Sequence, residues 1–449
     1  MSKGPITVVG AGLAGSEAAW QIARRGLEVR LCEMRPVRPT PVHRTDFAAE
    51  LVCSNSLKSL ELATPHGLLK EEMDRMGSLI LECARGARVP AGGALAVDRD
   101  RFAEAVTHRL EAEPKIELVR GEVTEIPEGV VVLAVGPLVA ESLQAEIGRF
   151  TGDDYLHFYD AIAPVVEADS IDRSIVFAES RYGKGDGDDY LNCPMDEAQY
   201  RAFIAELLAG EQAPLHEIDS TPFFEGCLPM EEMARRGVDT PRFGPMKPVG
   251  LTDPRTGERP YAVVQLRQDN LAAEHYSMVG FQTQLRWPEQ KRIFRTIPGL
   301  EQAHFVRLGQ IHRNCYINAP KVLTPWLATR RRTTLFFAGQ ISGVEGYTES
   351  AATGLLAGWN AARAASGEAP LSMPRETMLG ALCHYIAGAD PDDYQPTNAA
   401  FGLLPPVPGK QPRKRKERRL GRAERALEVL DAWLAEVEAP GASAIGIAR

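Results

Sequence analysis

A glycine-rich turn near the start of the chain has the residue types and spacing of a dinucleotide-binding site. The turn is Gly10-Ala11-Gly12-Leu13-Ala14-Gly15, and an acidic residue, Glu33, follows it. In a G-x-G-x-x-G turn the first glycine allows the tight turn. The second lets the backbone approach a pyrophosphate, and the third lets helix and strand pack closely. A carboxylate at Glu33 can accept hydrogen bonds from both ribose hydroxyls. The pattern predicts a dinucleotide site; the alternative is a glycine-rich turn without a ligand.

Cysteines are the other candidates for chemistry. The chain has seven, with no Cys-x-x-Cys pair, at positions 32, 53, 83, 193, 227, 315 and 383. This spacing argues against a zinc site and, in a chain of this size, against a disulfide scaffold. We therefore expect no bound metal, free thiols and a reducing cytoplasm. Taken by itself, each cysteine is expected to be a small buried apolar residue rather than a nucleophile.

The segments around the glycine turn would position such a ligand. A β-branched apolar run over residues 6–9 enters the turn, a helical pattern over residues 16–25 follows, and a strand over residues 27–32 stops at Glu33. The helix would offer free N–H groups and the positive end of its dipole to the phosphates. Helical periodicity resumes over residues 67–85, which predicts a further helix.

Two later segments resemble the first. Residues 130–137 predict a buried strand that ends at Gly136, and residues 333–340 predict another that ends at Gly339 and Gln340. A helix of small residues follows the second strand, and small side chains let a backbone approach a ring system closely. Dinucleotide signatures far apart in the chain, with other material between them, favour FAD over a nicotinamide cofactor held alone.

Length and composition indicate a globular enzyme of two or three domains. The chain has 449 residues, of which 44% are hydrophobic and 25% charged, which is ordinary for such proteins. No apolar run approaches the ~18 residues of a membrane helix. The N-terminal run leads into the glycine turn, so we also expect no signal peptide.

The predicted fold class is α/β: a discontinuous, Rossmann-like FAD-binding domain of the glutathione reductase type, with an inserted α+β domain and a helical C-terminal segment. The inserted domain is expected because strands become short and loops irregular from about residue 155, before dinucleotide patterning returns. We expect the FAD-binding domain over residues 1–155 and 301–370, the inserted domain over residues 156–300 and the C-terminal segment over residues 371–449.

The charge of the chain leaves nucleic-acid binding open. The net charge is −9, but a local basic patch can make phosphate contacts by itself. Residues 410–425 carry nine Lys and Arg residues against Glu417 and Glu424. This basic stretch is either a solvated linker and helix start or a contact for an RNA backbone. Arg88 and Arg99, around a second glycine-rich turn, are weaker candidates for RNA or flavin phosphate.

Seven segments together resemble one enzyme family over nearly the full length. They are GAGLAG, CSNSLKS, RVPAGGALAVDR, YLNCPM, FGPMKPVGL, HRNCYINAP and AGQISGVEGYTESAATG. They are similar to the folate- and FAD-dependent tRNA uracil-5-methyltransferases. A related class, the flavoprotein of the carboxymethylaminomethyl-uridine pathway, shares the first and last segments. It is disfavoured because Cys-Ser-Asn-Ser stands where a glycine-rich Cys-Asn-Pro segment is expected, and because no long C-terminal helical domain follows.

The resemblance implies methylation of the T-loop uridine of tRNA to ribothymidine. It implies methylenetetrahydrofolate as carbon source, NAD(P)H as reductant, FAD as cofactor and the T-arm of tRNA as partner. Uracil C5 becomes nucleophilic only after a group adds to C6, and a thiolate is suited to that addition. In this family the methylene passes by way of the reduced flavin. A base must also remove the C5 proton. The site therefore needs a thiolate, a base, a flavin and a flat stacking surface.

Four further residues match the family's motifs. Cys53 and Cys227 align with its two cysteines. We favour Cys227 for addition to C6 and Cys53 for the flavin side, as base or carbon relay, and the reverse assignment stays open. His312 could stack on the folate pterin, and Lys247 could hold folate glutamate or RNA phosphate; a structural histidine and a solvated lysine are the alternatives.

Three other functions compete with this one. A different tRNA-modifying flavoenzyme would share the fold and the RNA but would not need Cys227. A small-molecule flavin oxidoreductase or a non-enzymatic FAD-bearing RNA-binding protein would lack the methyl transfer altogether. Salt-dependent binding of unmodified tRNA separates the small-molecule enzyme from the rest. The sequence leaves open NADH against NADPH and the oligomeric state.

Overall fold

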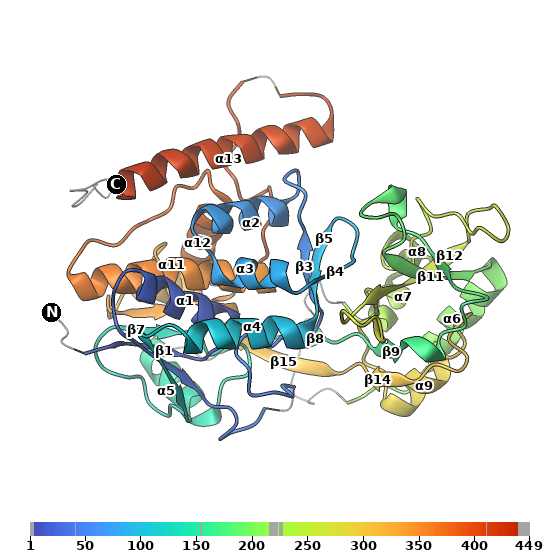
Figure 1. Ribbon diagram of the computed structural model, residues 1–449, viewed down its shortest axis with the longest axis horizontal. Coiled ribbons are helices and arrows are strands. Elements are labelled where there is room, and N and C mark those ends of the chain that lie inside the picture. Colours follow the sequence, from blue (N-terminus) through green and yellow to red (C-terminus); the bar gives the residue numbers. More distant parts are fainter. Residues whose placement is uncertain are drawn as a thin grey trace.

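The chain folds into two lobes, each built on its own sheet (Figure 1). The computed structural model describes residues 4–40, 42–152, 155–214, 223, 228–409 and 411–438, without the side chains of Phe158, His312 and Arg313. The first lobe contains both termini of the described chain, and the second holds the green and yellow segments at the right of Figure 1. Among the described helices none is long and apolar enough to cross a membrane.

A five-stranded parallel sheet forms the centre of the first lobe. Its order is β16-β7-β1-β2-β6, with bounds β1 (Ile6–Val9), β2 (Val29–Glu33), β6 (Ile116–Arg120), β7 (Val131–Leu133) and β16 (Leu335–Phe337). The strands are short. Most of their residues are buried because helices cover the sheet, as is usual for parallel sheets. The helices of this lobe are α1 (Leu13–Arg24), α2 (Pro65–Arg75), α3 (Leu79–Gly86), α4 (Arg99–Glu111), α5 (Glu141–Thr151), α10 (Ala319–Val322), α11 (Tyr347–Ser366), α12 (Met378–Gly388) and α13 (Arg415–Glu438).

Helices α1 and α11 come from distant parts of the chain and pack with their backbones almost in contact. A Cβ at Gly354 would lie 2.1 Å from the Ala14 carbonyl oxygen, and one at Gly358 would lie 2.6 Å from that of Ala18. Glycine is therefore required at both positions of α11. This packing brings the N-terminus of α11 to the same end of the sheet as the glycine turn that precedes α1.

Two small sheets lie beside the parallel sheet. One has the order β3-β5-β4, with β3 (Ser56–Ser59), β4 (Arg88–Val89) and β5 (Ala94–Val97). The other pairs β8 (Leu156–Ala161) antiparallel with β15 (Ile311–Tyr316). Strands β8 and β15 are the two connections between the lobes (Figure 1).

The second lobe is a six-stranded antiparallel sheet covered by helices. The strand order is β10-β11-β12-β13-β9-β14, with β9 (Val165–Glu167), β10 (Phe177–Ala178), β11 (Tyr190–Met195), β12 (Ala262–Gln268), β13 (His275–Met278) and β14 (Phe305–Arg307). Its helices are α6 (Glu197–Ala209), α7 (Met230–Arg236), α8 (Thr240–Phe243) and α9 (Trp287–Phe294). Buried apolar side chains of the sheet and helices form a core separate from that of the first lobe.

The predicted fold class is confirmed: a parallel α/β sheet is interrupted by an α+β lobe and followed by helices. The domain boundaries stay a prediction. The single helix expected over residues 67–85 is wrong in detail, because α2 and α3 are separate helices. Gly77, at φ +77°, ends the first, and Ser78 caps the second by accepting a hydrogen bond from the Leu81 N–H.

Candidate active site

The glycine turn combines two positions fixed by the protein with one that faces open space. Gly10 has φ +96°, and a Cβ there would lie 2.5 Å from the Ala134 carbonyl oxygen. A Cβ at Gly15 would lie 1.7 Å from the Gly10 oxygen. At Gly12, in contrast, a Cβ would meet no described protein atom within 4 Å. The space above Gly12 therefore fits a ligand that approaches the backbone.

The start of α1 is suited to a phosphate group. Gly12 is the N-cap residue, and no described side chain accepts a hydrogen bond from the first turn. Leu13, Ala14 and Gly15 form that turn, so their N–H groups and the positive end of the helix dipole are available to an anion.

Glu33 lies at the end of β2, where it touches the turn. Its carboxylate accepts hydrogen bonds from the Ala11 N–H at 2.9 Å and from Arg35 Nε at 2.8 Å. Burial raises the pKa of Glu33, but the hydrogen bonds and charge of Arg35 outweigh it, so the net pKa lies below its ordinary value. The residue is therefore an ionised acceptor at the place expected for a ribose.

Two more glycines lie at the carboxyl ends of neighbouring strands. Gly136 follows β7 with φ +67°, and Gly339 follows β16 with φ +78°. The Gly339 N–H donates to Thr353 Oγ1 of α11 at 2.9 Å, and the amide of Gln340 donates to the carboxylate of Glu345. The carboxyl edge of a parallel sheet is where ligands bind in such folds.

A cavity of about 500 Å³ lies between this edge and the second lobe. Both lobes line it. Its charged and reactive side chains are Cys53, Lys58, His66, Asp160, Arg267 and Glu345. The backbone from Gly346 to Thr348, at the start of α11, also lines it. The segment that leads to Cys53 is also joined to the glycine turn, because the Ala49 N–H donates a hydrogen bond to the Ala11 oxygen at 2.8 Å.

Hydrogen bonds from several elements fix the loop that carries Cys53. The Tyr347 hydroxyl accepts hydrogen bonds from the N–H groups of Cys53 at 2.8 Å and of Ser54 at 3.1 Å. Arg267 of β12 donates to Ser54 Oγ at 2.9 Å and to Asn55 Oδ1 at 2.8 Å. Arg307 donates to the Val52 oxygen at 2.7 Å and Arg99 to the Leu51 oxygen at 3.3 Å. Since Arg267 and Arg307 belong to the second lobe, both lobes fix this loop.

The Cys53 thiol faces a carboxylate. Its Sγ lies 3.4 Å from Asp160 Oδ2. Burial raises the pKa of the Cys53 thiol well above its ordinary value, and the negative charges of Asp160 and Glu345 raise it further. Burial and the charge of Asp160 likewise raise the pKa of Glu345 well above its ordinary value. These buried surroundings therefore favour the protonated forms of the Cys53 thiol and of the Glu345 carboxyl group.

A third carboxylate beside the cavity, Glu349 of α11, stays ionised. Glu349 is fully buried, lies 3.1 Å from His66 Nδ1 and accepts from the Ala399 N–H at 3.0 Å. Burial alone would raise its pKa, but the positive charge of Lys58 and the hydrogen bond with His66 hold the pKa of Glu349 at about 2.

The structure says less about how the remaining predicted site residues lie relative to the cavity. Cys227 lies outside the described residues. His312 pairs with Asp160 in the register of β15 against β8, and its side chain is not described. Lys247 is half-buried in the loop after α8 and is absent from the described lining of the cavity. The other five cysteines, at positions 32, 83, 193, 315 and 383, are buried.

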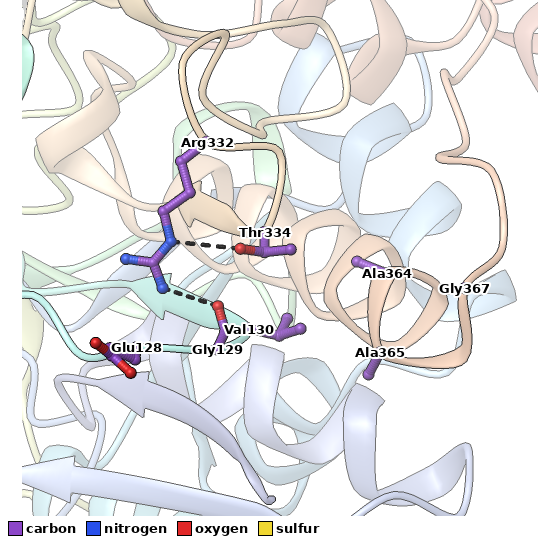
Figure 2. A pocket seen from close by; sticks show the side chains of 8 residues that line it. All are labelled: Glu128, Gly129, Val130, Arg332, Thr334, Ala364, Ala365 and Gly367. Atoms are coloured by element: carbon purple, nitrogen blue, oxygen red, sulfur yellow. Dashed lines mark hydrogen bonds between the residues drawn. The ribbon is translucent and has the colours of Figure 1, made fainter. Parts of the chain in front are cut away.

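A second pocket lies at the opposite edge of the parallel sheet (Figure 2). Val130 and Thr334 line it just before β7 and β16, at the amino ends of these strands. Its arginine, Arg332, donates to the Gly129 oxygen at 2.8 Å and to Thr334 Oγ1 at 3.3 Å. Because this cation is engaged by the protein itself, the cavity between the lobes is the stronger candidate. Within the described chain, no group of three metal-ligating side chains gathers at either place.

Comparisons with known proteins agree on the same relatives. The model of the family described as "Glucose inhibited division protein A" matches residues 5–369. A protein of Symbiobacterium thermophilum, named methylenetetrahydrofolate--tRNA-(uracil-5-)-methyltransferase TrmFO, is 58% identical over 96% of this chain and 98% of its own length. A protein of the same name from Geotalea uraniireducens is 58% identical over 97% of this chain and 99% of its own.

Among solved structures, that of Aquifex aeolicus GidA superposes with a TM-score of 0.69. It covers 95% of this chain and 76% of the GidA chain. At 17% sequence identity, this likeness supports the fold alone.

Proposed function

Because the chain belongs to the family of the tRNA (uracil-5-)-methyltransferases named TrmFO, we propose that it methylates uracil C5 in tRNA with a carbon from methylenetetrahydrofolate. Membership confirms the resemblance inferred from the motifs. The observation that supports this activity most directly is the position of Cys53. Its thiol lies in a cavity bounded by the segments that follow β7 and β16 on one side and by the second lobe on the other.

The protein would hold FAD at the carboxyl edge of the parallel sheet. The open space above Gly12, the uncapped start of α1 and the ionised carboxylate of Glu33 fit a pyrophosphate and a ribose. Gly136, Gly339 and Gln340 lie where the rest of the group would extend. Bound FAD supplies the two-electron reduction that converts a one-carbon unit into a methyl group.

The chain's own residues provide the nucleophile, the proton transfers and the positioning. Cys227 adds to uracil C6, which makes C5 nucleophilic, and Cys53 acts on the flavin side as base or carbon relay. The exchange of these two roles is the alternative. His312 and Lys247 serve the folate, by stacking and by charge respectively.

The substrate and reductant are further parts of the proposal. We assign the T-loop uridine of the T-arm as the target, which becomes ribothymidine, and NAD(P)H as the source of the hydride. The motifs quoted above support these assignments. The free thiols of the described chain suit a reducing cytoplasm as the place of the reaction.

Product analysis tests the function directly. FAD-loaded protein would be incubated with unmodified tRNA, NADPH and methylenetetrahydrofolate labelled in its methylene carbon. The RNA is then digested and examined for ribothymidine by mass. We expect labelled ribothymidine from the wild type and its loss in Cys53→Ala or Cys227→Ala, while Cys83→Ala keeps the activity. No ribothymidine from protein that carries FAD and binds tRNA would refute the function.

A further inference from the structure

We propose that Asp160 accepts the proton of the Cys53 thiol and is thus a catalytic residue of the cavity. The inference rests on the proposed function and adds a step to it. Whether Cys53 acts as a base or as a carbon relay, its sulfur must first lose a proton. The structure assigns that proton to a particular oxygen atom.

Geometry presents one carboxylate oxygen to the sulfur. Asp160 is 5% exposed and lies near the end of β8. Its Oδ1 accepts a hydrogen bond from the Ala161 N–H at 2.8 Å, which orients the carboxylate. Its Oδ2 lies 3.4 Å from Cys53 Sγ, within the range of a hydrogen bond to sulfur.

Both members of the pair are held in place independently. Strand β8 fixes Asp160 through its pairing with β15. The Cys53 loop is fixed by the Tyr347 hydroxyl and by Arg267, which belong to α11 and β12. Since neither side depends on the other for its position, the short sulfur–oxygen distance is set by the fold.

The charges around the thiol select Asp160 over its neighbours. Asp160, Glu345, Tyr347 and Arg99 of α4 are the titratable or charged groups that interact electrostatically with the thiol, and the backbone of His312 lies opposite Asp160. The carboxylate of Glu345 already accepts a hydrogen bond from the Gln340 amide. The Tyr347 oxygen already accepts two backbone hydrogen bonds. Asp160 is then the basic group in contact with the thiol among the described side chains.

The step is a proton transfer without change of oxidation state. The S–H bond of Cys53 breaks, an O–H bond forms at Asp160 Oδ2, and the single negative charge moves from the carboxylate to the sulfur. The thiolate is the reactive form of cysteine. The carboxylic acid left behind can return the proton at the end of the cycle.

Replacement of Asp160 should change the acidity of the Cys53 thiol and the rate of methylation in opposite senses. In Asp160→Asn the negative charge beside the sulfur is lost, so the thiolate forms at lower pH. The acceptor of the proton is lost as well, so the reaction slows. If Asp160 acted on the thiol through its charge alone, its loss would lower the pH at which the thiolate forms and would also speed the reaction.

The experiment uses FAD-loaded wild type, Asp160→Asn and Asp160→Glu. Alkylation of Cys53 by iodoacetamide is followed against pH by the mass of the peptide that contains it. Single-turnover methylation of unmodified tRNA is measured on the same preparations. For Asp160→Asn we expect the alkylation midpoint to fall by at least about one pH unit and the methylation rate to fall at least about tenfold. Asp160→Glu should recover part of the rate.

Two results would overturn the assignment. One is an alkylation midpoint that does not move in Asp160→Asn, because the carboxylate would then not face the thiol. The other is a methylation rate that stays equal or rises. If Asp160→Asn loses FAD, the comparison of Asp160→Glu with wild type decides, since a base displaced by one methylene must slow the reaction. Absence of ribothymidine from the wild type would refute the proposed function, whereas the alkylation midpoint tests the thiol–carboxylate pair independently.

Discussion

The hydroxyl of Tyr347 accepts a hydrogen bond from the backbone N–H of Cys53 at 2.8 Å, across almost three hundred residues of sequence. Tyr347 is the first residue of α11, and α11 packs against α1 through Gly354 and Gly358. The helix that follows the last strand of the parallel sheet therefore holds the Cys53 loop, and the Ala49 N–H joins the segment before that loop to Ala11 of the turn that follows the first strand.

Substitution Tyr347→Phe should slow methylation. The change removes the acceptor for the N–H groups of Cys53 and Ser54, and an unpaired buried donor costs about 1–3 kcal/mol. We expect the loop to shift and the single-turnover rate to fall at least about tenfold, while FAD absorbance is retained. Tyr385→Phe is the control, since its hydroxyl bonds the Gln395 oxygen at 3.3 Å on the exposed side of α12. Equal rates for the two variants would contradict the role of Tyr347.

The second lobe should contribute to the single-turnover rate of methylation through Arg267. Its guanidinium bonds Ser54 and Asn55 at once, which the ammonium of a lysine cannot reproduce. Arg267→Lys should therefore lower the single-turnover rate at least about tenfold. Arg292→Lys is the matched control, because Arg292 is a surface residue of the same lobe paired with Glu206 and Glu289. A wild-type rate in Arg267→Lys would show that the loop does not need this lobe.

Gly12→Ala should separate cofactor binding from folding. Its Cβ would meet no protein atom within 4 Å, and the φ of −72° suits alanine. We expect the apoprotein to keep its Tm within a few degrees, since alanine in place of a glycine N-cap costs at most about 1 kcal/mol, and to lose most of its FAD absorbance. Gly15→Ala is the contrast: its Cβ would overlap the Gly10 oxygen, so the protein itself should fail to fold. Full FAD occupancy in Gly12→Ala would refute the proposed pyrophosphate position.

The parts of the site that lie close together in sequence could be predicted. The glycine turn and Glu33 belong to one strand–helix–strand unit, whose spacing alone brings them together. The partners of Cys53 could not be predicted in this way. Asp160, Arg267 and Tyr347 come from β8, β12 and α11, and only strand register and the docking of the two lobes place them around one thiol.

Residue types gave little signal for these partners. A lone aspartate in a polar strand or a tyrosine after a glycine is compatible with a surface position as well as with a cavity. The break between α2 and α3 is hidden from periodicity for a similar reason, because apolar periodicity continues through Gly77 while the backbone turns there. The fold class is easier to predict, since alternating strands and helices follow from periodicity.

Stability should depend on pH through Glu72, outside the active site. Glu72 of α2 accepts hydrogen bonds from the N–H groups of Met378 at 2.6 Å and Leu379 at 2.9 Å, at the start of α12. Burial raises its pKa to about 8 from an ordinary value of 4.5, although these hydrogen bonds oppose the rise. Because the folded pKa is raised, the stability that it contributes is fully present below pH 4.5 and is lost as the pH rises through about 8.

Glu72→Gln should remove that dependence. The amide keeps an acceptor for α12 and cannot ionise. Relative to wild type, the variant should gain up to about 1.4 kcal/mol for each pH unit between pH 4.5 and pH 8 and nothing further above that range, measured as the change in the Tm difference between pH 6 and pH 8. Glu71→Gln, an exposed neighbour on α2 paired with Arg75, should show no such trend. A Tm difference that is constant with pH would contradict the raised pKa of Glu72.

The basic stretch divides into two groups with different expected roles. Arg422 donates to the Phe401 oxygen at 3.0 Å, and Arg425 donates to the oxygens of Pro405 and Pro406. These arginines hold the segment before α13 against the protein. Lys414, Arg415 and Lys416 are exposed around the start of α13, where Lys414 also pairs with Glu417 at 3.2 Å, so their charges are accessible to an RNA backbone.

Alanine at Lys414, Arg415 and Lys416 should weaken the binding of unmodified tRNA. Three lost phosphate contacts predict that the slope of log K against log salt becomes shallower by about two to three. Methylation at saturating tRNA should stay unchanged, because no residue of α13 is among the described residues that line the cavity. The matched control exchanges three exposed arginines of the same lobe, Arg30, Arg149 and Arg331, and should keep the wild-type slope. A wild-type slope in the triple alanine variant would instead identify the stretch as a solvated linker and helix start, because phosphate contacts cannot be removed without changing counterion release.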